Sequence, residues 1–490
     1  MLNNRRTFCQ IVAGGFASLV VRPASAAALE SANDAIPALL PRDDQGRNFV
    51  LYSDCCSGSP GPNARNLQAV NSVVSRISPP PEFISFPGDA IGGYTDDYTE
   101  LRRQWDYWLG TEMAWLRGRD LPLYQSTSNH NTYDAGSEQV FREVHPDLPQ
   151  NGPTSQQGLA YYIRKGNLLY VSTHQPDQKQ LIDYDWLRRV LTEHADCRFK
   201  FVTGHFPVFP VNGYLAWPNW CFPPEQRRPF WDILVEHKVD AYLASHIIAF
   251  DVQAHDGILQ ILSGGAGTNH GPGGFMPGTS EYLHAVQVAI DNQGLRYRVR
   301  DDQGRVREQL SWPLEHPAVK DWRELDVPQA SDTLSAVDWS KEVVALRISG
   351  RFQRERPHQE DQTILCGIDF SEGVEPVWIG IDGDSGRLVV RIVPLSGYGW
   401  QVWMGPKLKV GDSFDFQLAF HPDMGPGGVL YRQQETDAWS TLESTSCKGT
   451  ESLKPPVRWA VGHSQSGAED RRFVGGDLNI RFIHQARPKF

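Results

Sequence analysis

The stretch that decides the fold is residues 82–93, EFISFPGDAIGG, where an apolar run rich in strand formers stops at Gly88 and Asp89. A strand that ends in a glycine and then an acid places the carboxylate at the C-terminal edge of a sheet, where open α/β sheets hold their ligands. Gly-Asp is also a common turn sequence after a strand. The neighbouring strands therefore decide whether Asp89 has a chemical role.

The flanking sequence repeats this pattern. NFVLYSD at 48–54 is a strand that ends in an acid, and LPLYQSTSNH at 121–130 is a strand that ends in an Asn-His pair. Helical patterns at 64–77 and 98–117 separate these strands from the central stretch. Alternating strands and helices predict parallel strands joined by helical crossovers.

Further strands follow along the chain. LLYVSTH at 168–174 is apolar, RFKFVTGHFPVF at 198–209 ends its strand at a Gly-His pair, and VDAYLASH at 239–246 ends at a Ser-His pair. We expect GILQILSGGAGT and YLHAVQVAI, at 257–268 and 282–290, to form an antiparallel hairpin that closes the sheet. Oxygen and imidazole ligands from separate strands that meet at one sheet edge assemble a divalent metal site. The candidates are Asp54, Asp89, Asn129, His130, His205 and His246.

As an ordered set, these strand ends resemble the motifs of the calcineurin-like metallophosphoesterases, nearest to the purple-acid-phosphatase branch, over roughly residues 46–300. The resemblance implies a four-layer αββα sandwich that holds two metal ions and hydrolyses phosphate esters. It implies that Asp89 bridges both metals and that Asp54 belongs to the first. Asn129, His205 and His246 then complete the second metal site, and His130 stands beside the phosphate as the acid.

The sequence departs from the family pattern at three positions. Cys56 stands where the first motif has histidine, Ile248 stands where the last motif ends in histidine, and Asn131 replaces the acid that orients the active-site histidine. A Cys56 thiolate is a metal ligand that favours zinc or iron over magnesium or manganese, whereas isoleucine is no ligand. We therefore expect one or two metal ions per chain, zinc, iron or manganese, at an altered site.

Other interpretations of these residues stay open. His270, Asp96 or Asp97 are alternative sources of the missing ligands, and an ordinary surface-loop histidine is the simpler interpretation of His270. Asp54 also suits a turn cap, and the apolar residues after His246 also suit a packed histidine. The aromatic residues 211–224 either wall a substrate pocket or pack against a second domain.

The first residues, MLNNRRTFCQIVAGGFASLVVRPASAAA, carry paired arginines, an apolar run at 8–21 and an Ala-Ser-Ala site at 24–26. This pattern predicts a twin-arginine signal peptide over residues 1–26, with an apolar run too short to span a bilayer. We therefore expect an exported protein, periplasmic or extracellular, without a membrane span. An oxidising compartment permits disulfides, and Cys366 with Cys447 is the first candidate pair.

The 490 residues carry a formal net charge of −11 and no block of basic residues, so the surface offers no footprint for nucleic acid. Residues 40–300 form the expected phosphoesterase domain, and the charged, proline-spaced residues 301–335 form the expected linker. Residues 336–490 alternate in many short apolar runs, which predicts an antiparallel, jelly-roll-like β-sandwich similar to concanavalin or laminin-G modules. Its Trp378, Trp400, Trp403 and Trp439 either offer stacking faces to a glycan or fill the core.

Three hypotheses result. The first is an exported metal-dependent phosphoesterase that acts on a phosphomonoester or phosphodiester, with the sandwich holding it to a polymeric or glycosylated target. The second is a non-catalytic protein that keeps the phosphoesterase scaffold and uses the sandwich to bind a glycan or a partner. The third is metal-dependent hydrolysis of another ester on the same scaffold.

Overall fold

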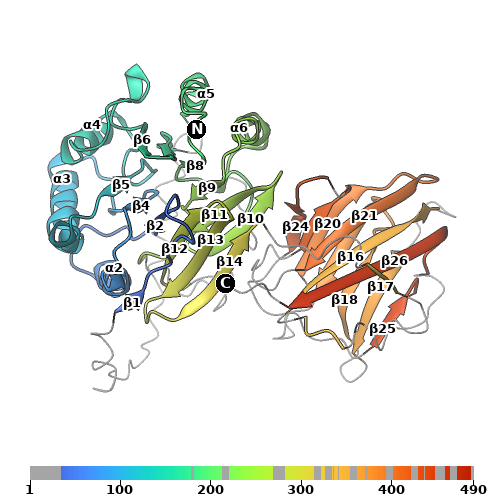
Figure 1. The fold of residues 1–490 in the computed structure, drawn as a ribbon. Coiled ribbons are helices and arrows are strands. Elements are labelled where there is room, and N and C mark those ends of the chain that lie inside the picture. The colour runs from blue at the N-terminus through green and yellow to red at the C-terminus, as the bar shows by residue number, and fades with distance from the viewer. Residues whose placement is uncertain are drawn as a thin grey trace, which may run out of the picture.

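The computed structural model describes residues 35–177, 181–211, 220–268, 282–313, 322–325, 334, 336–339, 342–353, 361–369, 374–392, 401–420, 429–434, 436–446, 458–463 and 472–486. The expected signal peptide, His270, Trp400 and Cys447 lie outside these residues. None of the described helices is long and apolar enough to cross a membrane. Mixed sheets with helical crossovers make the first half of the chain an α/β structure (Figure 1).

The first sheet has six strands in the order β14-β13-β12-β2-β4-β5. Its strands are β2 (Arg47–Leu51), β4 (Ile84–Phe86), β5 (Leu123–Gln125), β12 (His284–Asp291), β13 (Gly294–Asp301) and β14 (Val306–Trp312). β2, β4 and β5 are parallel, and the other three pair antiparallel. The crossovers run through α2 (Pro62–Val74) and α3 (Tyr98–Tyr107). This part confirms the predicted alternation of strands and helices.

The second sheet also has six strands, in the order β10-β11-β9-β8-β7-β6. Its strands are β6 (Tyr161–Lys165), β7 (Leu168–Ser172), β8 (Phe199–Thr203), β9 (Ala241–Ala244), β10 (Phe250–His255) and β11 (Ile258–Ser263). The four central strands are parallel, and β6 and β10 pair antiparallel at the two edges. α5 (Tyr184–Glu193) and α6 (Pro224–Glu236) are its crossovers.

The expected hairpin between 257–268 and 282–290 is wrong. β11 pairs with β9 and β10 in the second sheet, whereas β12 pairs with β2 and β13 in the first. The hairpin partner of β11 is β10, because Asp256 and Gly257 between them take left-handed φ angles of 50° and 82°. Asp-Gly with two left-handed residues is the favoured two-residue hairpin turn.

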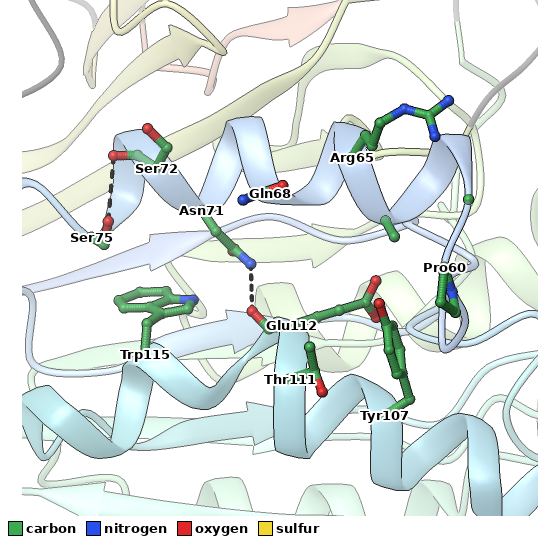
Figure 2. Close-up of a pocket in the computed structure, with 12 residues that line it drawn as sticks. Pro60, Arg65, Gln68, Asn71, Ser72, Ser75, Tyr107, Thr111, Glu112 and Trp115 are labelled. Atoms are coloured by element: carbon green, nitrogen blue, oxygen red, sulfur yellow. Dashed lines mark hydrogen bonds between the residues drawn. The ribbon is translucent and has the colours of Figure 1, made fainter. Parts of the chain in front are cut away.

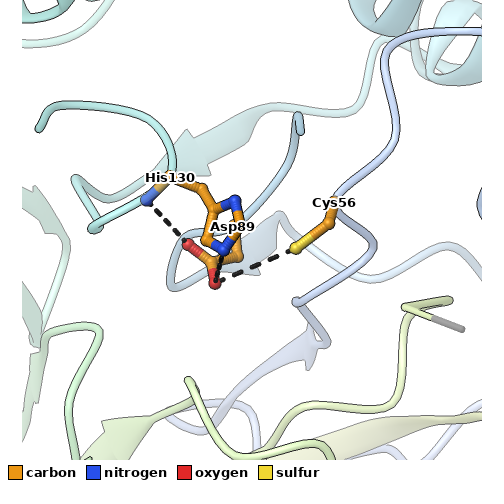
Figure 3. A group of neighbouring side chains, drawn as sticks. All are labelled: Cys56, Asp89 and His130. Carbon is orange, nitrogen blue, oxygen red and sulfur yellow. Dashed lines mark hydrogen bonds and ion pairs between the residues drawn. The ribbon is translucent and has the colours of Figure 1, made fainter. Parts of the chain in front are cut away.

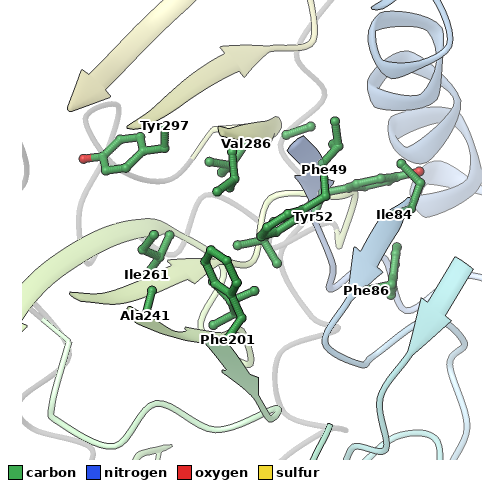
Figure 4. Close-up of a cluster of buried hydrophobic side chains, with 14 of the residues drawn as sticks. Phe49, Tyr52, Ile84, Phe86, Phe201, Ala241, Ile261, Val286 and Tyr297 are labelled. Atoms are coloured by element: carbon green, nitrogen blue, oxygen red, sulfur yellow. The ribbon is translucent and has the colours of Figure 1, made fainter. Parts of the chain in front are cut away.

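The two sheets pack face to face through large aromatic and branched side chains (Figure 4). Phe49 of β2 stacks on Phe83 with 4.8 Å between ring centroids and meets Phe201 of β8 edge-on at 5.0 Å. A second apolar cluster lies between the second sheet and α5 and α6. With both faces of each sheet covered, the carboxyl ends of the parallel strands are the places where polar side chains gather.

Shorter elements complete the first half of the chain. They are β1 (Ile36–Pro37), β3 (Ile77–Ser78), α4 (Ala135–Val144), the 3-10 helices η4 (Ala114–Arg119) and η5 (Thr154–Gln156), and the π-helix η3 (Trp108–Glu112). The stretch 98–117, predicted as one helical run, is thus three helical segments of different pitch. α3 begins at Asp97, whose side chain accepts hydrogen bonds from the amides of Thr99 and Glu100. Asp97 is therefore a helix cap and not a spare metal ligand.

The C-terminal part has two six-stranded antiparallel sheets around one apolar core. The first contains β15 (Arg323–Glu324), β16 (Glu342–Phe352), β21 (Ser413–Phe420), β22 (Val429–Arg432), β23 (Ser440–Thr441) and β26 (Gly475–Ala486). The second contains β17 (Gln362–Asp369), β18 (Val374–Ile381), β19 (Arg387–Ile392), β20 (Gln401–Lys407), β24 (Glu443–Ser446) and β25 (Arg458–Val461). The expected linker 301–335 includes β14, which extends the first sheet of the N-terminal half, and β15.

The tryptophans considered for glycan stacking are buried where they are described. Trp378 and Trp403 are each 1% exposed, and Trp439 is 7% exposed. Trp439 packs in the cluster that includes the sheets of the N-terminal half. These three rings fill cores and offer no stacking face.

The two halves meet at β10, the edge strand of the second sheet. The amides of Ala254 and Asp256 donate to the hydroxyls of Thr441 and Ser440 on β23, at 2.8 and 2.9 Å. Alternate amides of an edge strand point away from its own sheet, so the two hydroxyls take the place of a further strand. The interface also has an apolar part, to which Leu430 and Trp439 contribute.

Candidate metal centre

The strand ends carry an unusual backbone. Asp54, Cys56, Asp89 and His246 all take left-handed φ angles, of 63°, 40°, 52° and 72°. Side chains other than glycine rarely adopt this conformation, and each instance costs on the order of 1–3 kcal/mol. Such strain persists only where the surroundings impose it, and it gathers at functional sites.

Gly88 allows the strand ends to approach one another. Its φ is 119°, and a Cβ placed there would lie 2.5 Å from the Cβ of Ser128 and 2.7 Å from Nδ1 of His205. The next amide, that of Asp89, donates to the Ser128 hydroxyl at 2.9 Å. Gly88, in the stretch 82–93, is thus required because two other strand ends pack closely against it.

Four side chains bring their ligand atoms to one point, and we call Asp89, Asn129, His205 and His246 the imidazole cluster. Nε2 of His205 lies 2.7 Å from Oδ1 of Asn129, 3.3 Å from Oδ1 of Asp89 and 3.0 Å from Nδ1 of His246. Nδ1 of His246 lies 3.1 Å from Oδ1 of Asn129. The strand ends that carry them come from both sheets, from β4 and β5 of the first and from β8 and β9 of the second, and not from one edge.

These distances fit a cation. Ligand atoms about 2.1 Å from an octahedral ion stand about 3.0 Å apart, which is the spacing found here. The ring of His205 is also fixed in the required tautomer, because its Nδ1 lies 3.0 Å from the carbonyl oxygen of Pro87, which can only accept, and 2.8 Å from the Ser245 hydroxyl. Nε2 then holds the lone pair that faces the cluster.

Asp89 also takes part in a second group, the thiol cluster of Cys56, Asp89 and His130 (Figure 3). Oδ2 of Asp89 lies 4.0 Å from Sγ of Cys56 and 3.9 Å from Nε2 of His130. All three ligand atoms lie within 4.8 Å of one another. Nδ1 of His130 lies 2.7 Å from the carbonyl of Gly92, so Nδ1 carries a proton and Nε2 is the ring nitrogen that faces the cluster.

Asp54 lies beside the two clusters but outside both groups of close ligand atoms. Its Oδ2 accepts from the amide of His246 at 3.1 Å and lies 2.9 Å from the Ser53 hydroxyl. Its Oδ1 is buried and has no hydrogen-bond partner among the described residues. A buried carboxylate oxygen without a donor is costly unless a cation or water satisfies it, so this atom also fits a metal-binding role.

The charges of the site are strongly coupled. Burial, and next the charge of Asp89, raise the pKa of Asp54 to about 7. Burial opposes ionisation of Asp89, but His205 and His130 outweigh it and lower its pKa. Burial by itself lowers the pKa of His205, but the negative charge of Asp89 outweighs burial and raises this pKa above its usual value. Burial, and next the charge of His205, hold the pKa of His246 well below its usual value.

The remaining sequence candidates have other roles. Asn131 is buried, and its Oδ1 lies 3.5 Å from the amide of Ile91; the carbonyl of Gly92 contacts His130 in its place. Ile248 is half-buried beside the site. Of the aromatic stretch 211–224, Trp220 and Phe222 are described: the ring of Trp220 meets that of His246 edge-on at 6.1 Å, and Phe222 is buried against Phe230.

Two contributors were missed from the sequence. Glu112, in the π-helix η3, accepts from the Ser57 hydroxyl at 2.5 Å and from the amide of Gly58 at 3.2 Å, so it holds the loop that carries Cys56. The hydroxyl of Tyr94 accepts a hydrogen bond from the side-chain NH₂ group of Asn129. A π-helix next to a functional loop is a common association, but no local sequence signal announces it.

A groove of about 540 Å³ lies on the far side of Glu112, between α2 and η3 (Figure 2). Gln68 and Asn71 from α2 and Trp115 from η4 contribute to its walls, and Asn71 donates to the carbonyl of Glu112 at 3.0 Å. None of the predicted metal ligands lines it. The imidazole and thiol clusters are therefore separate from this groove, and Glu112 is the residue that connects the loop of Cys56 with the groove.

Comparison with known proteins gives distant matches. No family model and no curated protein matches the sequence. Among solved structures, a purple acid phosphatase from yellow lupin seeds is 12% identical, with 55% of this chain and 54% of that chain covered and a TM-score of 0.41. PhoD is 8% identical (56% and 73% covered, TM-score 0.38), and the anchor of the Plasmodium inner membrane complex is 12% identical (56% and 90% covered, TM-score 0.38). This chain thus spans about half of the lupin phosphatase, and at such scores nothing about its activity follows from the matches.

Proposed function

We propose that the chain is an exported metal-dependent phosphoesterase of the calcineurin-like class, with an altered metal site and a four-layer αββα arrangement over residues 40–300. The observation that carries the proposal is the convergence of Asp89, Asn129, His205 and His246, from four strand ends, to spacings of 2.7–3.3 Å. These residues would hold one divalent or trivalent ion, zinc, iron or manganese. Two such cations clamp phosphoryl oxygens and activate a water near neutral pH.

The chain's own residues supply the rest of the site. Asp89 belongs to both the imidazole cluster and the thiol cluster, so its carboxylate would contribute a ligand to each cation position. Asp54, with a free buried oxygen, and the Cys56 thiol would be this chain's own ligands of the first metal position, to which Ile248 contributes none. A Cys56 thiolate would favour zinc or iron at that first position.

His130 has two candidate roles, metal ligand and acid. As the acid it would carry a proton on each ring nitrogen, with Nδ1 directed at the Gly92 carbonyl and Nε2 at Asp89, whereas as a ligand it would present the lone pair of Nε2. The contact of Nδ1 with Gly92 fits both roles, so an experiment has to separate them. His130→Ala distinguishes the roles: a metal count per chain that falls by one assigns a ligand, and an unchanged count with lost turnover assigns the acid.

The experiment that tests the function is elemental analysis of the purified protein together with turnover of a phosphomonoester and a phosphodiester under several added metals. Asp89→Asn should remove the metal from both clusters and abolish turnover. Asp106→Asn, at an exposed acid on α3, is the matched control. An Asp89→Asn protein with the full metal content contradicts the assignment.

The second candidate function is a non-catalytic binding protein, and Ile248 together with Asn131 favours it, since neither residue can do what the family residues do there. Full metal content without turnover of any phosphate ester would select it. The C-terminal sheets, proposed as a jelly-roll-like sandwich at 336–490, would then carry the binding. Because Trp378, Trp403 and Trp439 are buried, any glycan contact has to use other residues.

A further inference from the structure

Tyr94 occupies a strained and exposed position beside the two clusters of candidate ligands. It follows Gly92 and Gly93 in the loop after Asp89, takes a left-handed φ of 49° and is 58% exposed. Gly93 has a φ of 56°, and a Cβ there would lie 1.8 Å from the carbonyl oxygen of His130. An exposed aromatic ring held in an unfavourable backbone conformation points to a role outside packing.

The hydroxyl of Tyr94 orients a member of the imidazole cluster. Nδ2 of Asn129 donates to it at 2.7 Å, which turns Oδ1 of Asn129 toward His205 and His246. A flipped amide would direct its NH₂ group at the cation position, where it has no lone pair to offer. The phenol therefore gives the NH₂ group of Asn129 an acceptor in the amide orientation that would bind a metal.

The ring of Tyr94 is fixed against the other cluster. It meets the ring of His130 edge-on at 4.5 Å and lies 5.3 Å from the ring of Tyr133. The hydroxyl of Tyr133 accepts from the amide of Thr95 and donates to its carbonyl, at 3.1 and 2.7 Å, so the loop is tied down directly after Tyr94. Across the site, Trp220 stands against His246. Aromatic side chains thus border the metal centre on two sides.

We propose that Tyr94 is a positioning residue for Asn129 through its hydroxyl, and that its exposed ring forms the surface against which the leaving group packs, so that the site prefers aryl over alkyl phosphate esters. The inference rests on the proposed phosphoesterase function. The two parts are separable because phenylalanine keeps the ring and leucine keeps neither group.

The hydroxyl is tested by metal affinity, measured by competition with a chromogenic chelator for zinc and for manganese. Tyr94→Phe should weaken binding by about 10–100-fold, the range for partners that orient a ligand. Tyr98→Phe is the matched control, since Tyr98 is an exposed tyrosine four residues away whose hydroxyl donates to Asp134. Equal affinity in Tyr94→Phe and wild type overturns the positioning role.

The ring is tested by phosphate release from phenyl phosphate and from n-propyl phosphate at saturating metal. The ratio of the two kcat/KM values should fall about 2–10-fold in Tyr94→Leu and stay at the wild-type value in Tyr94→Phe. A ratio unchanged in Tyr94→Leu overturns the leaving-group role. A wild-type protein that takes up no metal overturns the proposed function itself. If the wild type binds metal and hydrolyses both esters, the metal affinity of Tyr94→Phe and the kcat/KM ratio of Tyr94→Leu test the two roles of Tyr94.

Discussion

Replacing Gly88 with alanine adds one methyl group without touching any ligand atom, and it tests the close packing on which the metal centre depends. The new Cβ would meet Ser128 at 2.5 Å and Nδ1 of His205 at 2.7 Å, at a φ of 119° that side chains rarely adopt. The His205 ring therefore has to move away from the imidazole cluster. The contacts of its Nδ1 with the Pro87 carbonyl and the Ser245 hydroxyl, which fix the tautomer, would be lost with that movement.

The size of the effect has two parts. The backbone strain costs about 1–3 kcal/mol, and forcing a methyl group into a filled space costs about 1–3 kcal/mol more. The sum, about 2–6 kcal/mol, corresponds to a fall in Tm of at least about 4 °C, because about 1 kcal/mol shifts the Tm of a domain of this size by about 2–4 °C. Metal affinity should fall by 10-fold or more, since His205 leaves its place.

Calorimetry with and without added metal, and metal content by elemental analysis, measure both effects. Gly110→Ala is the matched control, because a Cβ at Gly110 meets no atom within 4 Å. Its Tm should stay at or above the wild-type value. If Gly88→Ala retained the Tm and the metal content of the control, the argument from close approach would be refuted.

Three further predictions follow from particular contacts. Ser245→Ala removes one of the two acceptors of the His205 ring and leaves the Pro87 carbonyl at 3.0 Å, so it should weaken metal binding by about 10-fold, the lower end of the range for partners that orient a ligand, in chelator competition. Burial lowers the pKa of His145 to about 3. The contribution of neutral His145 to the free energy of unfolding is therefore fully present above about pH 6.5 and is lost as the pH falls from there toward 3, by up to about 1.4 kcal/mol per pH unit. In urea unfolding, the difference in free energy between about pH 7 and about pH 5 should be smaller for His145→Phe than for the wild type. Ser440→Ala combined with Thr441→Val strips two amides of β10 of their acceptors and should cost about 1–3 kcal/mol for each, seen in denaturant unfolding.

The order of the strand ends could be predicted from sequence because each strand is a short apolar run that stops at a polar pair. Asp89, Asn129, His205 and His246 were all proposed as neighbours on that basis, and the structure brings them together. The family resemblance implies two sheets, but the local pattern does not assign the strands to them, since it says which residues form a strand and not which partner the strand pairs with. The misplaced hairpin at 257–268 has the same cause.

Other features of the site lack any local signal. The left-handed backbone at Asp54 and Asp89 has no reliable local signal, because aspartate adopts this conformation more often than most residues but still in a small minority of cases. Tyr94 follows two glycines and resembles an ordinary loop residue, and its contact with Asn129 arises only when two strand ends meet. β14 was hidden within 301–335 because its alternation is polar on both sides, VREQLSW, so it lacks the apolar run by which the other strands were found.

The hydroxyls of Ser440 and Thr441 at the edge of β10 have a consequence for shortened and unfinished chains. A chain that ends soon after Trp312 has every strand of the first two sheets, yet its outermost amides face solvent, and a bare edge recruits strands from other molecules. During synthesis on the ribosome, the edge of β10 stays uncovered until more than a hundred residues after Trp312 have been made, since β23 begins at Ser440. Truncated forms should therefore be lost to aggregation before any loss of ligand binding could be measured, and premature release of the nascent chain carries the same hazard.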